Sequence, residues 1–191
     1  MLRILRTTDY PSRPWKNGGG TTRDILVSPA GAALDDFDWR LSLAQVDRDG
    51  PFSRFDLVDR TLVLLSGAMT LHEPDRRIVL VRDEPVEFPG ERAIEATLSG
   101  GSTLDFNVMT RRGRATHSVR REVFGTRTDV ASAHGSTIVL FAIESGLSVD
   151  GELLDVHDSA VIVAQTVAVT ASRERVAALV VRIVDFHPNV L

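Results

Sequence analysis

Cysteine is absent from the 191 residues of this chain. Without thiols, the protein cannot form a disulfide, an iron–sulfur cluster or a zinc site held by thiolates, and it cannot use a cysteine nucleophile. Long apolar runs are missing as well, because charges interrupt every hydrophobic stretch before it could cross a bilayer, and residues 1–6 lack the apolar segment of a signal peptide. We therefore expect a cytoplasmic protein with no membrane partner.

A large excess of charge of one sign is also lacking. Charged residues make up 25% of the chain and the formal net charge is −4, which argues against a general nucleic-acid-binding protein. The chain is long enough to bury a sizeable hydrophobic core, so we expect its stability to require no cofactor.

Preassembled catalytic and metal-binding motifs are not found. No two of the histidines have the close alternate or helical spacing that commonly forms a metal site. No serine lies in a nucleophile elbow, and combinations of Asp and His are too common to indicate a hydrolytic triad. We therefore predict neither metal ligands nor catalytic residues. The five histidines are His72, His117, His134, His157 and His187.

Helical periodicity is nearly absent, whereas short β-like runs separated by turn signals dominate, which is typical of an all-β sandwich or barrel. Alternation is clearest in Trp39–Val46, where three apolar side chains share one face and Arg40, Ser42 and Ala44 share the other. One face of this strand is predicted to pack in a core, and the other is free to meet a ligand. The predicted strands cover residues 3–6, 24–27, 39–46, 61–65, 68–71, 77–81, 94–98, 115–124, 136–143, 147–149, 160–163, 167–170 and 177–186.

These strands form two series. Each series includes an apolar strand followed by a turn with glycine, Leu62–Gly67 in the first and Leu140–Gly146 in the second. This faint similarity favours a duplicated β-barrel, although an apolar strand followed by glycine also recurs by chance in all-β proteins. We predict a first half over residues 1–112 and a second, intimately packed half over residues 113–191, and exchange of strands between the halves stays open.

The segment Trp15–Arg23 contains three consecutive glycines between a large aromatic ring and a cluster of hydrogen-bonding side chains. Such a run indicates a backbone that turns tightly or approaches another group closely, as in the wall of a binding site. A flexible surface loop is the alternative. A phosphate-binding loop is disfavoured, because this segment follows two prolines and leads into a β-like run and not into a helix.

Two further clusters carry polar side chains. One is Asp47–Phe55, with Asp59 and Arg60 shortly after it, and the other is Asp105–Arg112. An arginine and a hydroxyl that point together into a cavity suit a carboxylate ligand, although a solvated sheet face explains the same pattern. Asn107 lies among apolar neighbours, so it is either a paired core group or a donor and acceptor that faces a ligand.

Taken together, the blocks at residues 15–24, 39–44, 49–60 and 105–112 resemble the HutD/Ves family. The resemblance implies an all-β, cupin-like fold with two β-barrel halves in one chain, a bicupin. It also implies a link to histidine utilisation, because HutD-like proteins are thought to moderate that pathway by binding an intermediate such as urocanate or formylglutamate. An enzymatic reaction is not implied.

The chain departs from the metal-dependent cupin pattern, because Leu71–Glu73 supplies a single histidine. A cupin barrel without its usual ligands still encloses a small molecule. Arg60 or Arg40 would then bind a carboxylate, and Asp49 and Asp59 would orient those arginines. The ligand-binding candidates are Trp15, Asn17, Gly20, Thr22, Arg40, Ser42, Asp49, Phe52, Ser53, Asp59, Arg60, Asn107 and Met109.

The leading hypothesis is a protein that binds a small carboxylate and modulates histidine utilisation without catalysing a reaction. One alternative is a cupin-type enzyme, either a metal-dependent oxygenase or isomerase, or a metal-free lyase with Asp49 or Asp59 as its base. Another is an interaction module whose second half packs against a partner. The sequence leaves self-association into a homodimer open.

Overall fold

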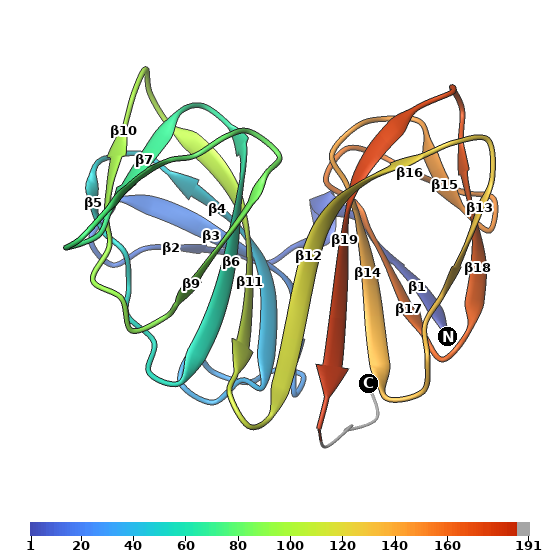
Figure 1. Cartoon of the computed structure of the whole chain (residues 1–191), viewed down its shortest axis with the longest axis horizontal. Helices are drawn as coiled ribbons and strands as arrows, with labels where there is room; N and C mark the ends of the chain where they lie inside the picture. Colours follow the sequence, from blue (N-terminus) through green and yellow to red (C-terminus); the bar gives the residue numbers. More distant parts are fainter. Residues whose placement is uncertain (187–191) are drawn as a thin grey trace. The chain divides into compact units, whose positions relative to one another are not determined.

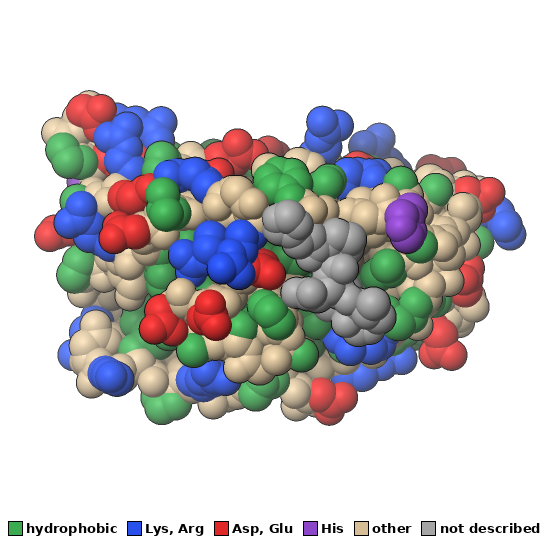
Figure 2. Space-filling view, turned by 90° about the horizontal axis from the view of Figure 1, so that it is seen from below, with side chains coloured by type: hydrophobic (Ala, Val, Ile, Leu, Met, Phe, Trp, Pro, Cys, Tyr) green, Lys and Arg blue, Asp and Glu red, His purple; other side chains and the backbone are tan. Residues whose placement is uncertain are grey.

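The computed structural model describes residues 1–186, so His187 lies outside the described part of the chain. Within this range the protein consists of antiparallel strands and turns, with one short 3-10 helix, η1 (Thr7–Asp9), and the all-β prediction is confirmed (Figure 1). No helix in residues 1–186 is long and apolar enough to cross a membrane. On the face shown in Figure 2, basic and acidic side chains both occur across the surface.

Residues 11–115 form one compact unit. Its larger sheet has six strands in the order β2-β3-β4-β11-β6-β9, and its smaller sheet has four in the order β5-β10-β7-β8. The six strands are β2 (Ser12–Pro14), β3 (Gly20–Ser28), β4 (Trp39–Val46), β11 (Thr103–Arg111), β6 (Val58–Ser66) and β9 (Pro85–Pro89). The four strands are β5 (Gly50–Pro51), β10 (Glu95–Leu98), β7 (Met69–His72) and β8 (Arg77–Val79).

Residues 1–10 and 116–186 form the other unit. Its sheets have the orders β1-β17-β14-β19-β12 and β13-β18-β15-β16. The first contains β1 (Leu2–Leu5), β17 (Ser159–Val163), β14 (Ser136–Ala142), β19 (Val176–Asp185) and β12 (Ala115–Phe124). The second contains β13 (Thr128–Ala131), β18 (Thr166–Ala171), β15 (Leu147–Val149) and β16 (Glu152–Leu154).

The first ten residues therefore group with the second half of the chain, an exchange of a strand that the predicted division at residue 112 left open. Strand β1 pairs with β17, with Leu2 opposite Ile162 and Leu5 opposite Ser159. Each unit has a hydrophobic core of its own. The core of the 116–186 unit includes Ile138, Leu140, Leu147, Val149, Leu154 and Ile162, and that of the 11–115 unit includes Val46, Leu62, Leu64, Met69, Leu71 and Ile94.

The six-stranded sheet brings the predicted polar positions into register. Strand β11 lies between β4 and β6, so that Met109 is opposite both Arg40 and Arg60. Asn107, two residues before Met109 on the same face of β11, is opposite Ser42 on β4. The apolar residues that alternate with them on β4 are fully buried, as the period of two predicts.

Candidate functional site

A cavity of about 590 Å³ opens on the inner face of the six-stranded sheet in the 11–115 unit. Its floor comes from alternate positions of β4 and β11 and from Arg60 on β6. Its rim comes from the segment that precedes β3 and from the loop between β5 and β6. Most of the predicted ligand-binding residues line it. They are Trp15, Asn17, Thr22, Arg40, Ser42, Phe52, Ser53, Arg60, Asn107 and Met109.

Three predicted residues do not line the cavity, and each has another structural role. Gly20 packs against Trp15 and the next strand, where an added Cβ would lie 2.2 Å from the Gln45 carbonyl oxygen. The Asp49 carboxylate accepts a hydrogen bond from the Leu98 amide at 2.7 Å. Asp59 is exposed and accepts from Arg112 Nε at 2.7 Å.

Arg112 forms a surface cluster with Asp59 and Glu91. Its guanidinium donates to Glu91 Oε1 at 2.5 Å and holds the pKa of that carboxyl down at about 2. Glu91 Oε1 also accepts from the Leu57 amide at 3.2 Å. Asp59 and Glu91 thus anchor the end of the loop that carries Ser53, and Asp59 does not orient Arg60 as the sequence suggested.

The glycine segment is an ordered wall and not a loose loop. Trp15 Nε1 donates to Thr22 Oγ1 at 2.7 Å, and the Trp15 amide donates to the Gly20 carbonyl at 2.9 Å. Asn17 closes the turn, because its Oδ1 accepts from the Gly19 amide at 2.9 Å. Gly18 has a φ of 64°, a backbone conformation that glycine adopts without strain. The turn therefore places the indole and the Thr22 hydroxyl at the rim of the cavity.

Arg40 lies on the cavity floor and pairs with Asp24 on β3. Both side chains are buried, and Arg40 donates to Asp24 Oδ1 through Nε at 2.8 Å and also through Nη2. Asp24 was not among the predicted partners of this arginine. The Asp24 carboxylate already neutralises the charge of Arg40. The Arg40 guanidinium therefore shapes the cavity floor, and it attracts an anionic ligand less than an unpaired arginine would.

Arg60 is the second buried guanidinium of the floor, and its partners are neutral. It donates to the Ser53 carbonyl at 3.2 Å and to Asn107 Oδ1 at 3.3 Å. Its Cζ atom lies 5.1–5.5 Å from the ring centroids of Phe52, Phe55 and Phe88. Burial lowers its pKa to about 10, so Arg60 stays positively charged at neutral pH.

Asp105 completes the floor and was not among the predicted ligand-binding residues. It is 2% exposed, and in residues 1–186 its Oδ2 atom has no hydrogen-bond partner. Burial raises the pKa of Asp105 to about 7, and the charge of Arg60 opposes that rise. A signal for this residue existed in the sequence, because Asp105 shares one strand face with Asn107 and Met109.

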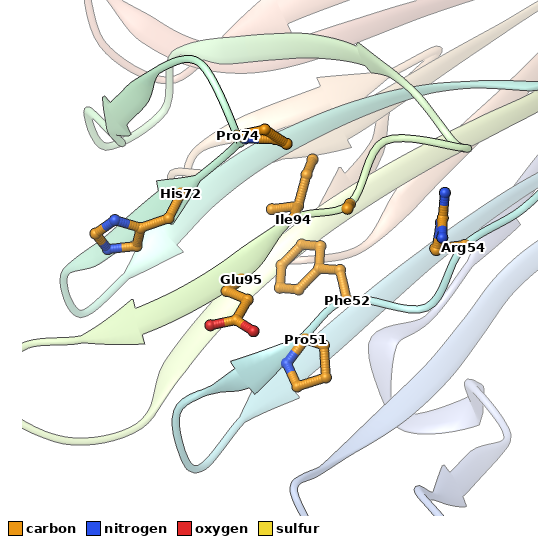
Figure 3. Close-up of a pocket in the computed structure, with 8 residues that line it drawn as sticks. Pro51, Phe52, Arg54, His72, Pro74, Ile94 and Glu95 are labelled. Atoms are coloured by element: carbon orange, nitrogen blue, oxygen red, sulfur yellow. The ribbon is translucent and has the colours of Figure 1, made fainter.

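A smaller cavity of about 340 Å³ lies in the same unit, toward the four-stranded sheet. Figure 3 shows Phe52 and Ile94 near its centre, with His72 and Glu95 to one side. His72 Nε2 is 2.9 Å from Thr97 Oγ1, so the single histidine of the Leu71–Glu73 segment has a hydroxyl partner. Among residues 1–186, no group of three or more His, Asp or Glu side chains could hold a metal ion. The polar side chains that line this cavity are Arg54, His72 and Glu95.

Comparison with known protein sequences identifies the family. The family model described as HutD matches residues 7–180. An uncharacterized 21.2 kDa protein in the hutC 3' region of Pseudomonas putida is 39% identical over 154 residues, 78% of this chain and 77% of the relative. Protein Ves of Citrobacter koseri is 40% identical over 113 residues, a region that spans 58% of each chain.

Solved structures agree with this assignment. HutD from Pseudomonas fluorescens SBW25 superposes with a TM-score of 0.82 at 26% identity, covering 98% of this chain and 100% of that one. A conserved protein of unknown function from Pseudomonas aeruginosa PAO1 has a TM-score of 0.82 at 31% identity, covering 96% and 98%. The Escherichia coli pirin YhhW has a TM-score of 0.70 at 6% identity, covering 97% and 99%, which shows the fold alone. The chain belongs to the HutD family and has the all-β, cupin-like fold that its sequence predicts.

Proposed function

We propose that this protein binds a small carboxylate of the urocanate or formylglutamate type, and that it modulates histidine utilisation without catalysing a reaction. The pathway is supported by the position of the Pseudomonas putida relative in the hutC 3' region and by the similarity to HutD of Pseudomonas fluorescens. The ligand class is supported by the cavity itself. Its volume of about 590 Å³ suits a small metabolite.

The observation that carries the proposal is that, within residues 1–186, the buried Arg60 guanidinium hydrogen-bonds to neutral oxygens and to no carboxylate. Four basic side chains line the cavity, Arg13, Lys16, Arg40 and Arg60, against the single carboxyl of Asp105. Within residues 1–186, the hydrogen bonds of Arg60 go to a carbonyl and an amide oxygen, and no carboxylate accepts from it. A ligand carboxylate would supply a charge-assisted bond there. The Trp15 indole and the Phe52 ring provide apolar walls for the rest of the ligand.

Titration calorimetry with urocanate and with formylglutamate tests this proposal. We expect binding of at least one acid, and a loss of roughly tenfold or more in affinity for Arg60→Gln, because a hydrogen bond to a charged group contributes about 1.5–3 kcal/mol. Arg77→Gln is the matched control, since Arg77 is exposed on β8 and lines neither cavity. Absence of binding of both acids at millimolar concentration would remove the proposed ligand class.

A second candidate is a cupin-type enzyme that acts on the same class of carboxylate, and one observation favours it. A cavity carboxyl whose pKa is raised to about 7 is suited to general acid–base chemistry. That carboxyl belongs to Asp105, whereas Asp49 and Asp59, the predicted bases, lie outside the cavity. Incubation of each acid with the protein, followed by NMR, separates the candidates. Conversion that is lost in Asp105→Asn favours the enzyme, and unchanged acid after prolonged incubation favours the binding protein.

A further inference from the structure

We propose that Asp105 determines the specificity of this cavity, so that it selects ligands with a carboxylate at one end and an N–H donor, such as an imidazole or an amide, at the other. The inference rests on the proposed function, in which Arg60 receives the carboxylate. It adds the chemistry of the opposite end of the ligand.

The cavity floor has two poles of opposite charge. Arg60 extends from β6 and donates to Asn107 on β11. Asp105 is the next residue on the same face of β11, two positions from Asn107, which corresponds to about 7 Å along the strand. Asp105 and Arg60 interact through their charges, and no direct hydrogen bond joins the two in residues 1–186. The floor therefore presents a cation from β6 and a carboxyl from β11 to the same cavity.

The surroundings of Asp105 do not satisfy its carboxyl. Its neighbours across the sheet are Ala44 on β4 and Leu64 on β6, which offer no side-chain donor. Oδ2 of Asp105 and Nε of Arg60 are both buried without a hydrogen-bond partner in the described part of the chain. Unpaired polar atoms of this kind are costly in a protein interior, and each one calls for an explanation. An N–H group of a ligand that donates to the Asp105 carboxyl would supply the missing partner.

Above about pH 7, where Asp105 loses its proton, its negative charge determines which ligand group can lie beside it. A second ligand carboxylate beside Asp105 would face a like charge and would bind only if a proton came with it. An N–H group instead donates to the ionised carboxyl, and this bond is strengthened by the charge of its acceptor. A ligand that is anionic at one end and a donor at the other thus complements Arg60 and Asp105 at the same time.

Matched pairs of acids test the inference by calorimetry. Urocanate is compared with cinnamate, in which a phenyl ring replaces the imidazole. Formylglutamate is compared with glutarate, which keeps both carboxylates and lacks the formamide, so that any repulsion by Asp105 is shared by the two members and only the N–H differs. We expect the member with the N–H to bind the unchanged protein about tenfold or more tightly in at least one pair. In Asp105→Ala this ratio should fall toward one, whereas affinity for the member that lacks the N–H should be kept or improved.

Two further variants make the result decisive. Asp105→Asn keeps the size of the side chain and is used if Asp105→Ala does not fold. We expect its ratio of affinities within a pair to lie between that of Asp105→Ala and that of the unchanged protein. Asp129→Asn, an exposed position in the other unit, should leave the ratio unchanged. Equal binding within both pairs, or a preference that survives both Asp105 substitutions, overturns the inference but leaves the proposed function standing. Failure of all four acids to bind overturns the proposed function itself.

Discussion

The buried carboxyl of Asp105 makes the stability of this protein depend on pH. Burial raises its pKa from 3.8 to about 7, in spite of the nearby charge of Arg60. Between these two values the folded state holds a proton that the unfolded chain releases. The contribution of Asp105 to the free energy of unfolding therefore decreases as the pH rises from about 4 to about 7, by at most about 1.4 kcal/mol per pH unit.

Asp105→Asn removes this contribution, so the variant should lose less stability than the unchanged protein as the pH rises across that range. Urea unfolding at half-unit intervals between pH 4 and pH 7 measures the two slopes. Asp129→Asn serves as the control, because Asp129 is exposed and its substitution should leave the slope unaltered. Parallel curves for Asp105→Asn and the unchanged protein would contradict the assignment of a raised pKa to Asp105.

Individual residues also show what the sequence could reveal about the site. Arg40, Ser42, Asn107 and Met109 were predictable, because a period of two places them on one face of their strands. The same rule argues against Asp59 as a partner of Arg60, since adjacent residues of a strand face opposite sides. Arg112, 53 residues away, takes the Asp59 carboxylate instead. Long-range partners of this kind have no local signal in a single sequence.

Strand β3 shows how an element can depart from a simple alternation. Its pairing with β4 shifts between Asp24 and Leu26, which marks a bulge in the ladder. Asp24 lies at this bulge, and its carboxylate accepts a hydrogen bond from Arg40 on the next strand. The sequence indicated a strand here from residue 24 onward, but a bulge depends on how two strands pair, so the Asp24–Arg40 ion pair was missed.

The start of β3 also explains one of the three consecutive glycines. A Cβ at Gly20 would lie 2.2 Å from the Gln45 carbonyl oxygen and 3.2 Å from the Trp15 ring. Gly20→Ala should therefore push β3 away from β4 or displace the indole, and we expect a loss of roughly 1–3 kcal/mol of stability, as for other overpacked sites. Chemical denaturation measures the loss, and a lowered affinity for the ligand should accompany it.

Gly125→Ala is the matched control for that substitution. The nearest atom to its added Cβ is the Glu174 carbonyl oxygen at 3.9 Å, an ordinary contact distance. This variant should change the free energy of unfolding by less than about 0.5 kcal/mol. If both alanine variants were equally stable, the close approach at Gly20 would not be the reason for its glycine.

On the scale of the whole molecule, the first strand belongs with residues that come more than 110 positions later. Strand β1 forms the edge of a sheet whose other members all begin at residue 115 or beyond. Most strands of both units were predictable from local alternation and turn signals. The grouping of residues 1–10 was not, because pairing between residues 2–5 and 159–162 depends on the assembled sheet and leaves no mark on either segment alone.

Strand β1 should therefore stabilise the unit that contains residues 116–186. Ile4 is partly buried and packs against the hydrophobic core of that unit, whereas its neighbour Arg3 is exposed on the same strand. Ile4→Ser should cost about 1–2 kcal/mol, because it removes apolar contact from the core, and it should weaken the hydrogen-exchange protection of β17 and β14. Arg3→Ser keeps the same backbone pairing and should change stability by less than about 0.5 kcal/mol. A loss in Ile4→Ser as small as that in Arg3→Ser would mean that β1 contributes through its backbone pairing alone, and that its apolar face adds nothing to the core.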